Sequence, residues 1–201
     1  MTLVNVGEFE SHAVVAPDFP RDLALGQHTK SLARTVYIDR EDFHEIDDAA
    51  YFGLALNKVA GLRYAGYVRV TGIERDAAGA IVGLTAEYDH TRSAAFAGAG
   101  VKVKGNLHWV SEGAAPCDLR LFSHLFLDNL DGDLGELNPA SETVIQGALA
   151  DACLAGAKPL EHFQFERVGF FTADADCVGG RLVFNLTVGL KEGAEAKKVR
   201  G

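Results

Sequence analysis

Short strand-forming segments separated by turn sequences most constrain how this chain can fold. The sequence offers about eight strand candidates, with a turn at roughly every 8–15 residues. The clearest pair covers residues 61–75 and 80–89, which flank the turn sequence Asp76-Ala77-Ala78-Gly79. Helical periodicity is almost absent, apart from one short turn expected within residues 39–45. The pattern therefore predicts an all-β protein of barrels or a sandwich, with short helices confined to the connections.

One segment combines a strand pattern with side chains suited to RNA. Phe163 and Phe165 alternate with polar residues, so we expect both rings to face a core and Gln164 to face outward. Arg167 breaks the alternation, and we expect a bulge or strong twist there, with Gly169 supplying the freedom. Such a bend brings the Gln164 amide and the Arg167 guanidinium to one surface, where both suit base edges. The alternative is an ordinary barrel strand with a salt-bridged surface Arg.

Composition excludes several classes of protein. With 201 residues, 48% hydrophobic and 23% charged, the chain has the composition of a soluble protein of one large or two small domains. It has no apolar run long enough for a membrane span, and residues 1–10 lack the features of a signal peptide. We therefore expect a cytoplasmic location and no membrane partner. The formal net charge of −9 argues against sequence-blind binding to nucleic acid, so any RNA partner requires a local basic patch.

Residues with catalytic or metal-binding spacing are sparse. The seven His residues are scattered, and Cys117, Cys153 and Cys177 are far apart and odd in number, which favours reduced thiols. His108 beside Trp109 is interpreted as a satisfied strand residue. The acidic pairs at 47–48 and 131–133 are typical of solvated turns. We therefore predict no catalytic residue, no metal ligand and no cofactor in this chain.

Domain organisation follows from the same pattern. Residues 1–33 have little periodicity and are expected to form an extended N-terminal arm. Residues 34–190 carry the strand candidates, with an internal boundary near 110, and residues 191–201 form a polar tail. The segment 90–101, which is rich in small residues, is expected to be a mobile loop.

An ordered set of motifs runs along most of the chain. The motifs are Arg34-Thr35-Val36-Tyr37-Ile38-Asp39-Arg40-Glu41-Asp42-Phe43, Lys102-Val103-Lys104-Gly105, His108-Trp109-Val110-Ser111, Arg120-Leu121-Phe122, Leu137-Asn138-Pro139, Phe163-Gln164-Phe165-Glu166-Arg167 and Val183-Phe184-Asn185. In this order they resemble the C-terminal anticodon-binding region of the glutaminyl-tRNA synthetases, and the resemblance extends from about Ala16 to Leu190.

The resemblance implies a fold and a role. The implied fold is two six-stranded β-barrels of the ribosomal L25-like type, one nested in the chain of the other. The implied role is to hold the anticodon loop of tRNA-Gln, with each unstacked base in its own pocket. The family's ATP and glutamine sites lie in a catalytic domain whose motifs do not occur here. The chain is thus expected to be non-catalytic by itself and to work with a synthetase catalytic domain in cis or in trans.

Seven residues are expected to bind RNA, and all of them except Tyr64 stand in these motifs. Arg34 and Gln164 are expected to meet the central uridine, and Arg167 the third-position guanine. Lys102 and Lys104, with the loop 90–101, are expected to hold the first base and nearby phosphates. The complete set is Arg34, Tyr64, Lys102, Lys104, Arg120, Gln164 and Arg167.

The chain departs from the family pattern at a few of these motifs. Val101 stands where the family has an Arg, His124 belongs to a Ser-His pair in place of Asp-Arg, and Leu186 replaces another Arg. These departures weaken the expected contacts to the first base and to the RNA backbone. The alternative function is therefore a relative that has lost tRNA reading and binds a protein or ribosomal RNA.

Overall fold

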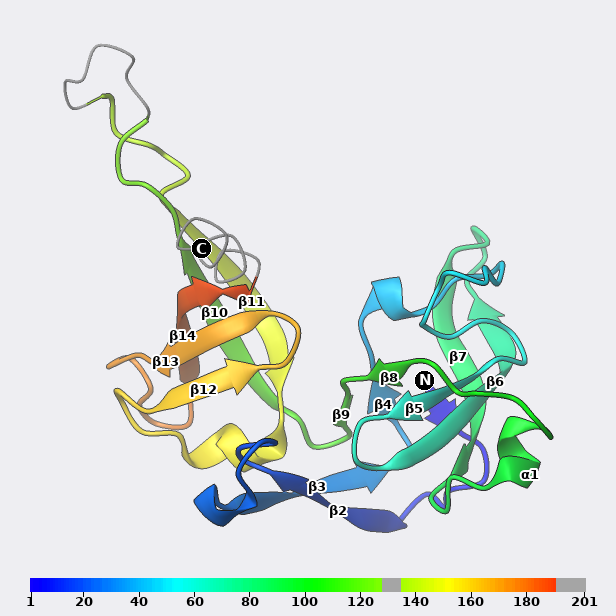
Figure 1. The fold of residues 1–201 in the computed structure, drawn as a ribbon. Helices are drawn as coiled ribbons and strands as arrows, with labels where there is room; N and C mark the ends of the chain where they lie inside the picture. Colours follow the sequence, from blue (N-terminus) through cyan, green and yellow to red (C-terminus); the bar gives the residue numbers. More distant parts are fainter. Residues whose placement is uncertain (128–134, 191–201) are drawn as a thin grey trace, which may run out of the picture. The chain divides into compact units, whose positions relative to one another are not determined.

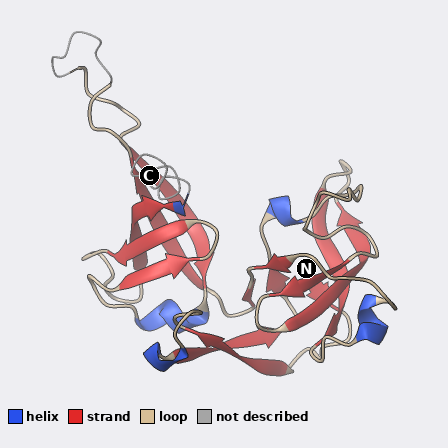
Figure 2. Ribbon diagram, viewed as in Figure 1, coloured by secondary structure: helices blue, strands red, loops and turns tan. Residues whose placement is uncertain are grey.

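The computed structural model describes residues 1–127 and 135–190, and its ribbon consists mainly of strands (Figures 1 and 2). The chain divides into two compact units. The first comprises Met1–Ala114 and Asp151–Cys153, and the second comprises Ala115–Ala150 and the chain from Leu154 onward. The all-β class expected from the turn spacing is confirmed.

The first unit contains one five-stranded sheet and two strand pairs. The sheet has the order β1-β7-β6-β5-β8, and the pairs are β2–β3 and β4–β9. Short helical turns lie only in the connections. The elements are β1 (Thr2–Leu3), β2 (Ser11–Pro17), η1 (Leu23–Leu25), β3 (Gln27–Ala33), β4 (Val36–Tyr37), η2 (Arg40–Asp42), β5 (Val59–Leu62), β6 (Gly66–Arg75), β7 (Ile81–Asp89), α1 (Ala94–Ala97), β8 (Asn106–Leu107) and β9 (Val110–Ser111).

The β6–β7 hairpin forms where the sequence predicts it. The Asp76 carboxylate accepts hydrogen bonds from the backbone N–H groups of Ala78 and Ala80, each at 2.9 Å. Gly79 adopts φ of 85°, a left-handed conformation that costs glycine least. The resulting strands place Val68, Val70, Leu84 and Ala86 in the core, which is closed by the buried Trp109.

The second unit is built on another five-stranded sheet, of order β11-β10-β14-β13-β12. Its core contains Phe171 and Phe184, both fully buried, together with Cys117 and Leu119. All three cysteines of the chain are free thiols. The elements are β10 (Ala115–Phe122), β11 (Glu142–Ala150), η3 (Ala152–Gly156), which begins at the return to the first unit, β12 (His162–Phe165), β13 (Gly169–Ala173) and β14 (Leu182–Gly189).

The segment 163–171 differs from its sequence-based prediction. We expected one strand with a bulge at Arg167, but the structure has two strands, β12 and β13, joined by a tight turn. Phe165 pairs with Gly169 across this hairpin, and the N–H of Val168 donates to the carbonyl of Phe165 at 3.0 Å. The expected orientation of the rings is confirmed, because Phe163 and Phe165 pack on the core while Gln164 is exposed.

Three further expectations concern the N-terminal region, the helical turn and the polar tail. The region 1–33, expected to be an extended arm, contains β1, β2, η1 and β3, and β1 pairs in parallel with β7. The expected helical turn in 39–45 is present as η2. The polar tail 191–201 and part of the acidic connection after Leu127 lie outside the described residues. Among the described helices, none is both long enough and apolar enough to cross a membrane.

Candidate nucleic-acid interface

Arg34 follows β3 and is held by backbone contacts on both sides. The N–H of Ala33 donates to Ser111 Oγ at 2.7 Å, and the same hydroxyl donates to the carbonyl of Thr35 at 3.0 Å. The N–H of Leu3 donates to the carbonyl of Arg34 at 2.8 Å. The Arg34 side chain is half-buried, and within the described residues its guanidinium has no ion pair. Its backbone is thus fixed while its charge is left for another partner.

Tyr64 lies in the tight turn between β5 and β6. Its φ of 67° is unusual for a bulky side chain, and such strain persists only where the surroundings enforce it. The indole N–H of Trp109 donates to the carbonyl of Arg63 at 3.0 Å and so holds the preceding residue. The Arg63 guanidinium carbon lies 5.1 Å from the centroid of the Tyr64 ring. The segment His108-Trp109-Val110-Ser111 therefore positions both Arg34 and Tyr64.

Lys102 and Lys104 are exposed just before β8. Lys104 Nζ lies 5.9 Å from the centroid of the Phe52 ring. Gly105 follows, and a Cβ added there would lie 1.7 Å from the carbonyl oxygen of Phe52. Only a residue without a side chain lets the strand pass this closely to the Phe52 backbone. In the part of the chain that the structure describes, neither lysine makes an ion pair.

Gln164 and Arg167 are presented by the β12–β13 hairpin. Gln164 is exposed on β12 between two core-packed rings, and Phe165 stacks on Phe171 with centroids 4.5 Å apart. Arg167 is exposed in the turn and has a φ of 67°. The left-handed backbone of Arg167, in the turn that joins β12 and β13, costs conformational free energy, and the pairing of Phe165 with Gly169 offsets this cost. The hairpin therefore gives both polar side chains a rigid base.

Arg120 occupies a different environment from the other candidates. Its guanidinium forms ion pairs with Glu142 at 3.8 Å, Asp174 at 3.2 Å and Asp176 at 2.6 Å. These carboxylates, together with hydrogen bonds, raise the pKa of Arg120. The geometry gives Arg120 a structural role in the second unit. Its expected contact with RNA stays a prediction.

The candidates fall into two groups. Arg34, Tyr64, Lys102 and Lys104 belong to the first unit, and Arg120, Gln164 and Arg167 to the second. The expectation that Arg34 and Gln164 meet the same base stays a prediction.

Cations stacked on aromatic rings are a feature of the first unit that the sequence did not indicate. Apart from the neighbours Arg63 and Tyr64, the two partners of each pair are separated in the sequence, and the fold brings them together. Among the described residues, all such contacts lie in this unit: Lys30 on Trp109, Lys58 on Tyr51, Arg63 on Tyr64, Arg69 on Phe96, Arg92 on Tyr67 and Lys104 on Phe52. Where the ring is accessible, such a pair offers a face for a base beside a positive charge.

The loop 90–101 is anchored at its start. The Asp89 carboxylate accepts hydrogen bonds from the hydroxyls of Ser93 and Thr91, both at 2.6 Å, and these bonds hold its pKa well below the usual range. Ser93 in turn caps α1, and the Arg69 guanidinium donates to the carbonyl of Phe96. The first part of this loop therefore has a defined local structure, and its expected mobility stays a prediction.

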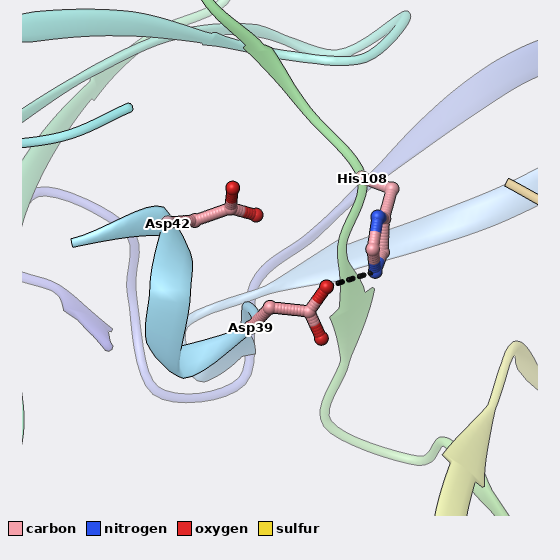
Figure 3. Close-up of side chains that lie close together, drawn as sticks. All are labelled: Asp39, Asp42 and His108. Carbon is pink, nitrogen blue, oxygen red and sulfur yellow. Dashed lines mark ion pairs between the residues drawn. The ribbon is translucent and has the colours of Figure 1, made fainter. Parts of the chain in front are cut away.

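Two carboxylates and an imidazole lie close together beside η2 (Figure 3). One potential ligand atom from each of Asp39, Asp42 and His108 lies within 4.8 Å of the others. His108 Nε2 is 3.1 Å from an Asp39 carboxylate oxygen, an ion-pair distance. Asp42 is buried, with 3% of its surface exposed. Sequence reasoning missed this cluster because His108 is more than sixty residues from both aspartates.

The cluster fits a structural clamp better than a metal site. A metal-binding His normally donates its second ring nitrogen to a carboxylate or carbonyl, which fixes the ring. His108 Nδ1 is buried and, within the described residues, has no hydrogen-bond partner. Asp42 is already engaged in an interaction of its own. The His108–Asp39 pair therefore joins the segment before β9 to η2, which helps to hold the chain that carries Trp109 and Ser111.

Comparison with known proteins identifies relatives along most of the chain. A family model described as tRNA synthetases class I (E and Q), anti-codon binding domain matches residues 1–89, and a second model with that description matches residues 106–174.

Individual relatives agree with these matches. A probable glutamine–tRNA ligase of Dictyostelium discoideum is 36% identical over 100% of this chain and 26% of its own length. The glutamine–tRNA ligase of Cupriavidus metallidurans is 40% identical over 96% of this chain and 34% of its own, and that of Bos taurus is 38% identical over 96% and 25%. The chain thus spans about a quarter to a third of the relatives it matches.

Proposed function

Because the chain belongs to the anticodon-binding domain family of the class I tRNA synthetases (E and Q), we propose that it binds the anticodon loop of tRNA-Gln. The observation that carries this proposal is the agreement of both family models with relatives that are glutamine–tRNA ligases. The half-buried, backbone-anchored Arg34 and Tyr64 and the exposed Lys102 and Lys104 in the first unit support it, as does the Gln164–Arg167 hairpin in the second.

Base reading is assigned to three side chains. Arg167 donates twice to the guanine of the third anticodon position, the commonest specific contact of Arg with a base. Gln164 donates to and accepts from the central uracil, and Arg34 supplies a further donor to that base. All three sit on backbone held by strand pairing or by hydrogen bonds, which provides the preorganisation that discrimination requires.

The lysines before β8 are assigned to the RNA backbone. Lys102 and Lys104 are exposed point charges, better suited to phosphate than to a bidentate base contact. Such contacts orient the loop without reading its sequence.

The chain would act as part of a larger system. Since it spans only about a quarter to a third of its relatives, we place the ATP and glutamine sites of the ligase in a catalytic domain that partners this one in cis or in trans. The proposed setting is cytoplasmic translation.

Binding of two anticodon stem-loops, measured by fluorescence anisotropy at low salt, tests the proposal. One loop carries the glutamine anticodon and the other has its third guanine replaced. We expect the chain to prefer the first. Arg167→Ala should weaken the cognate loop by about 1–3 kcal/mol and flatten the preference, because a bidentate Arg–guanine pair is lost.

Two further variants separate base reading from charge. Lys104→Ala should weaken both loops equally and lower the salt slope by about 0.7. Arg181→Ala, which removes an exposed Arg paired with Asp118 elsewhere in the second unit, should leave the preference unchanged. Equal binding of both loops by the wild-type chain, with Arg167→Ala without effect, would contradict the proposal and favour an interaction module that no longer reads tRNA.

A further inference from the structure

A hollow of about 430 Å³ opens on the surface of the first unit. Its volume falls within the roughly 300–1,000 Å³ typical of small-molecule pockets. Three segments distant in sequence form it: the start of β2, the β5–β6 turn and the end of β7. Ring side chains come from all three, namely His12, Tyr64, Tyr88 and His90.

The rings are held in defined positions. The centroids of His12 and His90 are 6.5 Å apart with their planes 10° from parallel, and His12 lies 5.8 Å from Tyr88. Asn5 fixes the backbone of Tyr88 by donating to its carbonyl and accepting from its N–H. The Glu10 carboxylate is 3.2 Å from His12 Nε2 and orients that ring.

Positive charge lies near the rings. The Arg63 guanidinium carbon is 5.1 Å from the Tyr64 ring, and that of Arg92 is 5.9 Å from the neighbouring Tyr67 ring. Arg92 follows His90, which lines the hollow, by two residues in the chain. Arg92 is exposed and, in the described residues, has no ion pair.

The hollow adjoins the proposed RNA-binding residues. Tyr64 lines it directly. Strand pairing places Ser11 opposite Ala33 and His12 opposite Leu32, so the β2 side of the hollow lies beside the chain that leads into Arg34. The hollow is open and polar, and its rings have cations nearby. Proteins bind the unstacked bases of single-stranded RNA on rings in such surroundings.

We propose that this hollow binds one unstacked nucleobase of the RNA loop, with the base stacked on the imidazole rings of His12 and His90. The inference rests on the proposed function and adds His12 to Tyr64 and the loop 90–101, for which the family resemblance already implied a role in RNA binding. Arg92, an exposed cation two residues after His90, is the residue that we assign to the phosphate attached to that base. Stacking of this kind tolerates different bases, so the hollow adds affinity more than sequence discrimination.

The test combines protein variants with loops that lack one base. His12→Ala, His90→Ala and the double variant are titrated against the glutamine-type anticodon stem-loop, and against loops with an abasic site at each loop position in turn. We expect the double variant to bind the intact loop about 5- to 150-fold more weakly, the loss of one stacked base. For one abasic loop, the wild-type chain and the double variant should bind alike.

His44→Ala is the matched control. His44 is an exposed imidazole of the same unit that stacks on Tyr51 with centroids 3.7 Å apart, away from the hollow. This variant should bind every loop as the wild-type chain does. Thermal unfolding of all variants verifies that the fold is intact.

Other outcomes distinguish a failure of the base site from a failure of the proposed function. If the wild-type chain binds the stem-loop but the double variant binds it equally well, or loses the same affinity for every abasic loop, the hollow is not a base site. If the wild-type chain does not bind the stem-loop, the proposed function fails. The hollow is then judged by the imidazole NMR signals during titration with an unstructured pyrimidine oligonucleotide. Shifts of His12 and His90 without His44 would support it, and no shift would overturn it.

Discussion

Gly169 shows how a single residue determines the shape of the β12–β13 hairpin. A Cβ added to Gly169 would lie 2.7 Å from both Val188 O and Leu186 Cδ1. Its role is therefore to let β13 approach β14, rather than to supply the bend that we expected from the sequence. The bend itself falls on Arg167, whose φ is 67°.

Gly169→Ala should destabilise the second unit by about 1–3 kcal/mol, because the added methyl group overpacks against a backbone carbonyl. The free energy of unfolding from urea denaturation measures this. Gly156→Ala is the control, since a Cβ there meets nothing within 4 Å. That variant should be unchanged or gain up to about 1 kcal/mol. Equal stability of the two variants would show that β13 and β14 are less closely packed than described.

Local residue patterns predicted some features and missed others for a definite reason. The facing of Phe163 and Phe165 follows from alternation alone, and the structure confirms it. The turn after Phe165 was missed because Glu166-Arg167-Val168 contains no residue that favours a left-handed backbone. The sequence did not reveal the ring cluster of the hollow, because His12 on β2 and His90 just after β7 lie far apart in the chain.

At the scale of elements, hairpins with local turn chemistry were predictable and long-range anchors were not. The β6–β7 turn could be inferred because Asp76 and Gly79 supply its hydrogen bonds and conformation. By contrast, the bond from Trp109 to the carbonyl of Arg63 spans 46 residues. No periodicity within a single element signals such a contact, although the motif that contains Trp109 was recognised as part of a family pattern.

The Arg120 cluster links three elements of the second unit and should make its stability pH-dependent. Arg120 on β10 pairs with Glu142 on β11 and with Asp174 after β13. The backbone N–H of Asp176 is the largest cause that lowers the pKa of Asp174, followed by the Asn185 amide, with Arg120 contributing further. A folded-state pKa below the unfolded value near 3.8 means that ionised Asp174 stabilises the fold above that pH. This contribution is lost as the pH falls through the folded-state pKa.

Asp174→Asn should therefore cost about 1–2 kcal/mol in the free energy of unfolding at pH 7, because hydrogen bonds to a charged group are lost. The difference between the variant and the wild-type chain should shrink as the pH falls below about 4. Glu112→Gln, at an exposed carboxylate with no ion pair in the described residues, should show no such dependence. A difference that stays constant from pH 7 to pH 3 would contradict the assignment.

At the scale of the whole molecule, some cations are paired with carboxylates and others are not. The chain carries a formal net charge of −9, yet several of its exposed cations have no carboxylate partner among the described residues, as for Lys102 and Arg92. Elsewhere carboxylates neutralise the cations, as at Arg120. Binding must therefore depend on local contacts, because the overall field repels a polyanion.

This distribution predicts selectivity between nucleic acids. The chain should bind the glutamine-type stem-loop at low salt with a log–log salt slope of about −2 to −3, as expected for three phosphate contacts from Lys102, Lys104 and Arg92. Duplex DNA of equal length should not saturate at protein concentrations that saturate the stem-loop, because it offers no unstacked base and meets a net repulsion. Titrations of both ligands over a range of KCl concentrations measure this. Comparable affinity for the duplex, with a steep salt slope, would mean that an unrecognised basic surface dominates binding and that the rings of the first unit contribute little.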